Sequence, residues 1–143
     1  MSELTLEAAR TIVDVALATG REMALEPLAV SVLDAGGHLK CFAREDGTGI
    51  LRFDIAFGKA WGALGMGFGS RTLANRAKDS AQFFTALAAA SGGRLVPAPG
   101  GVLIRDGAGR VIGAVGISGD RSDKDEACAV AGIEAAGLSA DTG

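Results

Sequence analysis

Hydrophobic and polar residues alternate along the chain in blocks that predict helices and strands in a definite order. Residues 5–24 carry apolar side chains three and four positions apart, which is typical of an amphipathic helix, and Thr5 is placed to cap it. Residues 28–33 are almost continuously apolar, as in a strand that is covered on both faces. Asp34 and two glycines then predict a tight turn, from which residues 39–43 return as the antiparallel partner.

Patterns of the same two kinds continue through the second half of the chain. They predict helices over residues 50–65, 80–90 and 122–136. Two strands, over residues 102–105 and 110–117, are predicted between the second and third of these helices. The first of these helices is apolar on nearly all sides, so we expect it to be buried against the sheet and against a second subunit. We expect the tail from Ser139 onward to be disordered. Because the strands come in hairpins, an antiparallel sheet with helices on its two sides is the simplest packing, and a Rossmann fold is disfavoured.

Length and composition narrow the class of protein. The 143 residues fit one domain, and 48% of them are hydrophobic, which is typical of a globular chain. The formal net charge is −3 and no basic run occurs, which argues against a nucleic-acid partner. No segment of about 20 apolar residues is present to span a membrane, and no signal peptide is visible, so we expect a cytoplasmic protein. With one histidine and two cysteines, Cys41 and Cys128, we expect no metal site built from side chains.

Five short motifs follow one another along the chain. They are VLDAGG at 32–37, FAREDG at 42–47, IA at 55–56 with KA at 59–60, PGG at 99–101, and GAVGISG at 113–119 with DE at 125–126. In these motifs the chain resembles the GlcG/HbpS-like family, over about residues 4–137. This family includes haem-binding HbpS and the C-terminal domain of PduO-type cobalamin adenosyltransferases. The resemblance implies an α+β, profilin-like fold of three α/β/α layers with a five-stranded antiparallel sheet, and homo-oligomers that are often octamers.

Two basic residues within these motifs are candidates for binding or chemistry. Lys59 lies in an otherwise apolar helix, where loss of water would lower its pKa and make it a base, an amine nucleophile or an anchor for an anion. Alternatively, its stem lies on apolar surface while its ammonium reaches a carboxylate or solvent. Arg44 could bind a carboxylate in bidentate fashion, or pair with Asp46 or Asp34. We expect Lys59 and Arg44 to converge at the mouth of an apolar crevice near a neighbouring protomer.

The remaining candidates each have a structural and a functional interpretation. Asp34 either bonds to its own turn or moves a proton, and Asp125 and Glu126 either stabilise the first helical turn or form an acid pair. Gly100 and its neighbour could offer amides to an anion. Trp61 stands where the family commonly has threonine, which alters the volume of the site that this helix lines. The predicted ligand-binding residues are Arg44, Asp46, Lys59, Trp61, Gly100, Gly101 and Asp125, and the predicted catalytic residues are Lys59, Asp34 and Glu126.

Three functions are compatible with this sequence. The first is a small-molecule-binding oligomer, with haem or a related tetrapyrrole as the leading ligand and His38, at a hairpin tip, poorly placed as its axial ligand. The cations available for haem propionates are Arg44, Arg52, Lys59 and Arg71. The second is an enzyme acting on a small organic acid or a carbonyl compound, in which Lys59 is the base or amine and Arg44 anchors a carboxylate. The third is a non-catalytic oligomeric accessory protein of a catabolic pathway.

Overall fold

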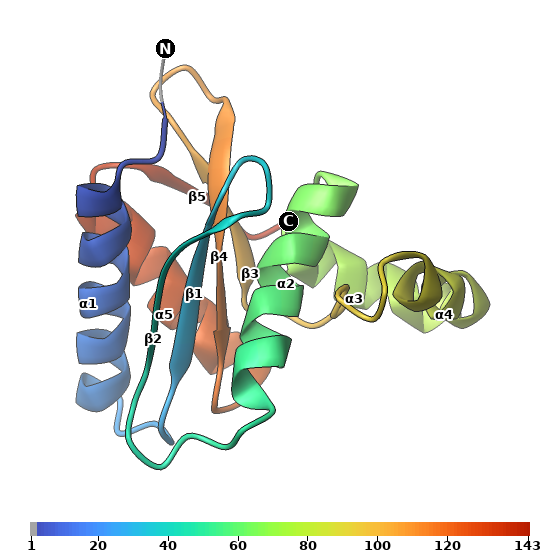
Figure 1. Ribbon diagram of the computed structural model, residues 1–143, viewed down its shortest axis with the longest axis horizontal. Helices are drawn as coiled ribbons and strands as arrows, with labels where there is room; N and C mark the ends of the chain where they lie inside the picture. Colours follow the sequence, from blue (N-terminus) through green and yellow to red (C-terminus); the bar gives the residue numbers. More distant parts are fainter. Residues whose placement is uncertain (1–2) are drawn as a thin grey trace.

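The computed structural model describes residues 3–143, and its central feature is an antiparallel sheet of five strands in the order β2-β1-β4-β3-β5 (Figure 1). Along the chain the elements are α1 (Leu6–Glu22), β1 (Ala29–Asp34), β2 (Leu39–Arg44), α2 (Arg52–Met66), α3 (Ser70–Asp79), α4 (Ala81–Ala90), β3 (Gly101–Arg105), β4 (Val111–Ser118), α5 (Ser122–Ala135) and β5 (Ser139–Asp141). Helices α1 and α5 cover one face of the sheet and α2 covers the other, which confirms the predicted α+β fold.

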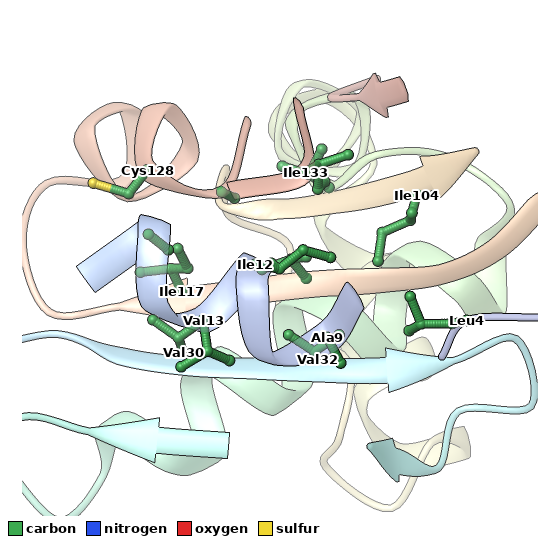
Figure 2. Close-up of a cluster of buried hydrophobic side chains, with 14 of the residues drawn as sticks. Leu4, Ala9, Ile12, Val13, Val30, Val32, Ile104, Ile117, Cys128 and Ile133 are labelled. Atoms are coloured by element: carbon green, nitrogen blue, oxygen red, sulfur yellow. The ribbon is translucent and has the colours of Figure 1, made fainter. Parts of the chain in front are cut away.

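The larger core lies between the sheet and helices α1 and α5 (Figure 2). Strand residues that alternate along β1, such as Val30 and Val32, face this core and pack near Ile12 of α1. Thr5 caps α1 as predicted, since its hydroxyl accepts a hydrogen bond from the Ala8 amide at 3.0 Å. Helices α1 and α5 approach closely at Gly132, where a Cβ atom would lie 2.6 Å from the Ile12 carbonyl oxygen. Glycine at this position therefore sets how tightly the two helices pack.

The opposite face of the sheet is covered by α2 through small and branched side chains. This second core consists of Leu33, Ala60, Ala63, Leu103 and Ala114. Helices α3 and α4 follow α2 and extend sideways, away from the sheet (Figure 1). They pack around a small cluster of Leu73, Phe84 and Leu95, which Met66 of α2 also contacts. Within residues 3–143, no helix combines the length and the apolar character that a membrane crossing needs.

The C-terminal tail is ordered, and the prediction of a disordered segment from Ser139 onward was wrong. Residues Ser139–Asp141 form β5, which pairs antiparallel with β3. Arg105 of β3 holds the Asp141 carboxylate at 2.9 Å, and the Arg71 amide donates to the carbonyl of Thr142 at 3.3 Å. A strand of three residues has too short a pattern to be visible in the sequence, because it owes its conformation to the strand beside it.

Candidate functional site

Lys59 and Asp125 form an ion pair inside the protein, at the junction of α2, β4 and α5. The Lys59 Nζ lies 3.2 Å from Asp125 Oδ2, and the two side chains are 3% and 1% exposed. The same Nζ donates to the Ile117 carbonyl at 2.8 Å. The second carboxylate oxygen, Asp125 Oδ1, accepts from the amide of Asp120 at 3.0 Å. The pair therefore ties two helices to the end of a central strand.

Burial shifts both members of this pair towards their neutral forms. Loss of water lowers the pKa of Lys59, and the attraction and hydrogen bond of Asp125 oppose that shift. Loss of water likewise raises the pKa of Asp125, against the opposing effect of Lys59. The desolvation that the sequence predicted for Lys59 is therefore present, but its ammonium is enclosed by partners of the fold. This arrangement does not favour Lys59 as a base or nucleophile that meets a substrate.

Gly100 and Gly101 pack against the same lysine. Gly100 has φ of +118°, and a Cβ atom there would lie 3.1 Å from Lys59 Nζ, so the position requires glycine. The Gly101 amide already donates to the Ser70 hydroxyl at 2.7 Å. A Cβ atom at Gly101 would collide with the backbone carbonyl of Lys59. Close packing thus accounts for both glycines, and the Gly101 amide is not available to an external anion.

Arg44 and Asp46 lie elsewhere, at a shallow depression of about 460 Å³ beyond the end of β2. The depression is lined by Arg21, Pro27, Arg44, Glu45 and Asp46. Arg21 is paired with Glu45 at 2.9 Å, whereas Arg44 is exposed. Lys59 is not part of this lining, so the predicted convergence of Lys59 and Arg44 at one opening does not occur. The reason is that Lys59 turns inward to Asp125 while Arg44 ends an edge strand.

The other two predicted catalytic residues are each engaged in a separate place. Asp34 closes the β1–β2 turn, because its Oδ1 accepts from the amides of Gly36 and His38, both at 3.0 Å. Partial burial would raise the pKa of Asp34, but these bonds and the His38 ring lower it overall. Glu126 accepts two guanidinium N–H groups of Arg71, at 2.9 and 3.0 Å. The structure therefore does not assemble Asp34, Lys59 and Glu126 into one catalytic group.

Trp61 lies in a different setting, between the hairpin tip and the segment after α4. A Cβ atom at Gly37 would lie 3.3 Å from the Trp61 ring, which shows how closely the indole covers the tip. On the ring, the guanidinium carbon of Arg94 lies 4.3 Å from the centroid. The Arg94 Nε in turn donates to the Ser91 carbonyl at 2.8 Å, which fixes the guanidinium in this position.

Two adjoining hollows meet at Trp61 and Gly65, and together they form what we call the Trp61 groove. One is about 140 Å³ and is lined by Ala35, Gly36, Gly37, Trp61, Leu64 and Gly65. The other is about 180 Å³ and is lined by Trp61, Gly65, Met66, Leu87, Ala90, Ser91 and Leu95. The lining is largely apolar, and the segment 80–93 beside it contains no charged residue. An aromatic ring with a fixed cation above it, in an apolar groove, suits a flat apolar ligand that carries negative charge at its edge.

The sequence identified Trp61 but not the other residues of this groove. Trp61 stands out in the sequence because it departs from the family pattern. Arg94 and Met66 lie in segments without a motif, and only the fold brings them to the indole. Among residues 3–143, no group of three or more His, Cys, Asp or Glu side chains could hold a metal ion.

Comparison with known proteins places these features in context. The family model described as haem degrading protein HbpS-like matches residues 4–134. Among solved structures, the PduOC–haem complex is 24% identical with a TM-score of 0.86, covering 96% of this chain and 97% of the other. Klebsiella pneumoniae protein ORFY is 25% identical with a TM-score of 0.86, covering 96% and 93%. A double mutant of Streptomyces reticuli HbpS is 26% identical with a TM-score of 0.78, covering 94% and 87%. A search of curated proteins finds no match.

Proposed function

Because this chain belongs to the HbpS-like family of haem degrading proteins, we propose that it binds haem or a related tetrapyrrole, and that the Trp61 groove holds the ligand. The observation that carries this assignment is the Trp61 indole, which lines both largely apolar hollows and has the Arg94 guanidinium over its ring. Proteins that bind haem need an apolar slot for the macrocycle and cations for its propionates. The PduOC–haem complex supports the same conclusion at the level of the fold.

The chemistry of the groove residues suits this class of ligand, but the volume of the groove limits how such a ligand can bind. Leu64, Leu87 and Leu95 line the hollows and supply apolar contacts, whereas the positive charge comes from Arg94, which lies on the Trp61 ring and outside both linings. Each hollow, at about 140 and 180 Å³, is smaller than the roughly 300–1,000 Å³ of common ligand pockets. A tetrapyrrole would therefore span both hollows and leave one face uncovered. A second copy of the chain could cover that face.

A haem titration with matched arginine variants tests the proposal. We expect the wild-type chain to shift the Soret band at micromolar haem, and we expect Trp61→Ala and Arg94→Gln each to weaken binding by about tenfold, which corresponds to roughly 1.4 kcal/mol. Arg44→Gln is the control, because it removes the same type of cation from the depression at β2. If the wild type causes no Soret shift, the proposal is wrong. If Arg44→Gln weakens binding while the groove variants do not, the ligand binds at the β2 depression.

We also propose that the chain self-associates, on the basis of apolar side chains exposed at the start of α2. Ile50 is 94% exposed, Leu51 63% and Phe53 36%. The Phe53 ring meets Phe42 edge to face and lies tilted against Phe57, with ring centroids 4.9 and 5.7 Å away, so this surface continues from the edge strand β2 onto α2. Exposed apolar surface of this kind is typical of an interface, and a second copy is the partner that the family resemblance implies. Should haem fail to bind, assembly without a ligand is the remaining hypothesis.

A further inference from the structure

A hollow between helices α3 and α4 brings charged and aromatic side chains together. The two helices project sideways from the sheet (Figure 1), and the hollow has a volume of about 280 Å³. Its lining consists of Met66, Arg76, Asp79, Ser80, Phe83 and Phe84. Only Met66 is shared with the Trp61 groove. A cation, an anion, a hydroxyl group and two aromatic rings therefore surround one small space that the proposed haem site does not use.

The two charged groups of this hollow lie near each other but do not form an ion pair. Arg76 and Asp79 are three positions apart on α3, so their side chains leave the same side of the helix. The guanidinium carbon of Arg76 lies 4.4 Å from the centroid of the Phe68 ring, a stacking contact that holds the cation in place. Within residues 3–143, neither charged side chain forms a hydrogen bond or an ion pair. Both charges are therefore available to a ligand.

The remainder of the hollow is aromatic and only partly covered. Phe83 is 55% exposed, although it belongs to the segment 80–93, which has no charged residue. Its ring meets Phe84 edge to face, with the centroids 5.9 Å apart, and Phe84 is buried in a cluster with Leu73. The buried ring thus supports the exposed one. An apolar group bound in the hollow would remove the surface of Phe83 from water, which is favourable.

We propose that the hollow between α3 and α4 binds a free α-amino acid with a large apolar side chain, in its zwitterionic form. The ligand carboxylate pairs with Arg76, its ammonium pairs with Asp79, and its side chain packs on Phe83. A simple acid or a simple amine would bring a like charge to one of the two groups, whereas a zwitterion pairs both. The volume of about 280 Å³ lies just below the roughly 300–1,000 Å³ of common ligand pockets, which suits a ligand of this small size.

Calorimetric titration of the full-length protein with three related compounds tests each contact separately. L-Phenylalanine carries both charges, N-acetyl-L-phenylalanine lacks the ammonium, and L-phenylalaninamide lacks the carboxylate. We expect the wild type to bind L-phenylalanine, and each derivative to bind at least about tenfold more weakly, because one charged partner is lost. Arg76→Gln should bind L-phenylalanine and its amide equally, and Asp79→Asn should bind L-phenylalanine and its N-acetyl derivative equally.

The controls use exposed positions, so that the variants keep the fold. Lys78→Gln removes a cation from the same helix but outside the lining, and it should bind L-phenylalanine as the wild type does. Phe83→Ala should weaken binding of L-phenylalanine, because the aromatic contact is lost. If the wild type does not bind L-phenylalanine at millimolar concentration, or binds all three compounds equally, the proposal is overturned. It is also overturned if Lys78→Gln weakens binding as much as Arg76→Gln, because general charge rather than the hollow would then account for binding.

Discussion

The buried Lys59–Asp125 pair offers the most direct test of the structural argument. Lys59→Met keeps the unbranched stem and removes the ammonium, so Asp125 Oδ2 loses its partner at 3.2 Å and the Ile117 carbonyl loses its donor at 2.8 Å. The Asp125 side chain is 1% exposed, which leaves its charge without water to replace the lysine. Breaking a buried pair in this way costs about 3–5 kcal/mol. Since the total free energy of unfolding of a domain is about 5–15 kcal/mol, the variant should be close to the limit of stability.

A second variant separates the charge from the packing. In Lys59→Met with Asp125→Asn, both charges are gone, while an amide oxygen can still accept from the Asp120 amide, which now donates at 3.0 Å. Replacing both members of a buried ion pair by neutral groups is often close to neutral. We therefore expect the double variant to recover at least about 2 kcal/mol of the loss caused by Lys59→Met alone.

Urea unfolding at neutral pH, followed by circular dichroism, measures these free energies. Arg121→Gln is a suitable control, because Arg121 is paired with Asp123 at 3.8 Å on the surface and should cost less than about 1 kcal/mol. The reasoning is refuted if Lys59→Met lies within about 1 kcal/mol of the wild type, or if the double variant is no more stable than the single one. Haem titration at a temperature where Lys59→Met is folded adds a second readout: unchanged binding supports an internal role, and lost binding would restore Lys59 as a ligand contact.

Three further predictions concern the surface, the thiols and the C-terminus. Ile50→Glu should shift light scattering towards a smaller species, whereas Leu6→Glu, at another exposed aliphatic residue, should not; equal behaviour of the two variants would contradict the proposed interface. Burial raises the pKa of the Cys128 thiol to about 11. Iodoacetamide at pH 8 should therefore label the half-buried Cys41 first, and Cys128 only after unfolding in urea; mass spectrometry measures the order of labelling. Deleting 139–143 should lower the free energy of unfolding by about 1–3 kcal/mol, because β3 loses its hydrogen-bonded partner; an unchanged urea midpoint would show that β5 contributes nothing.

The sequence predicted the elements whose pattern is local, and it did not predict contacts between distant segments. The period of residues 5–24 and the Asp34 turn were sufficient for α1 and the first hairpin, within about two residues of the observed ends. The sequence predicts a desolvated Lys59 because no other charge interrupts that part of the helix. Its partner, Asp125, is 66 positions away, and no pattern in the sequence connects the two. For the same reason Arg94 could not be assigned to Trp61.

Several residues of the family motifs serve to pack α2 and α5 against strands β3 and β4, rather than to contact a ligand. Gly116 lets β4 contact the backbone of α2 at Ala56, and Gly101 does the same for β3 at Lys59. Asp125 then secures that lysine from α5. Motif residues from four elements are thus used in one packing unit.

The proposed ligand contacts fall outside this packing unit. Trp61 is half-buried and Arg94 is exposed, and the hydrogen bonds of the Lys59 ammonium go to Ile117 and Asp125 rather than to either of them. Because Trp61 also packs against the second core, a change in the groove should alter which ligand binds and lower stability less than a change in the ion pair does. We expect Trp61→Ala to cost clearly less free energy of unfolding than Lys59→Met, even though the indole is the larger group to remove, because its loss opens a surface groove rather than an internal cavity. Urea unfolding of Trp61→Ala beside its haem titration measures both quantities on one sample. If haem affinity and stability fall together, the groove is part of the core, and the separation of fold from ligand is wrong.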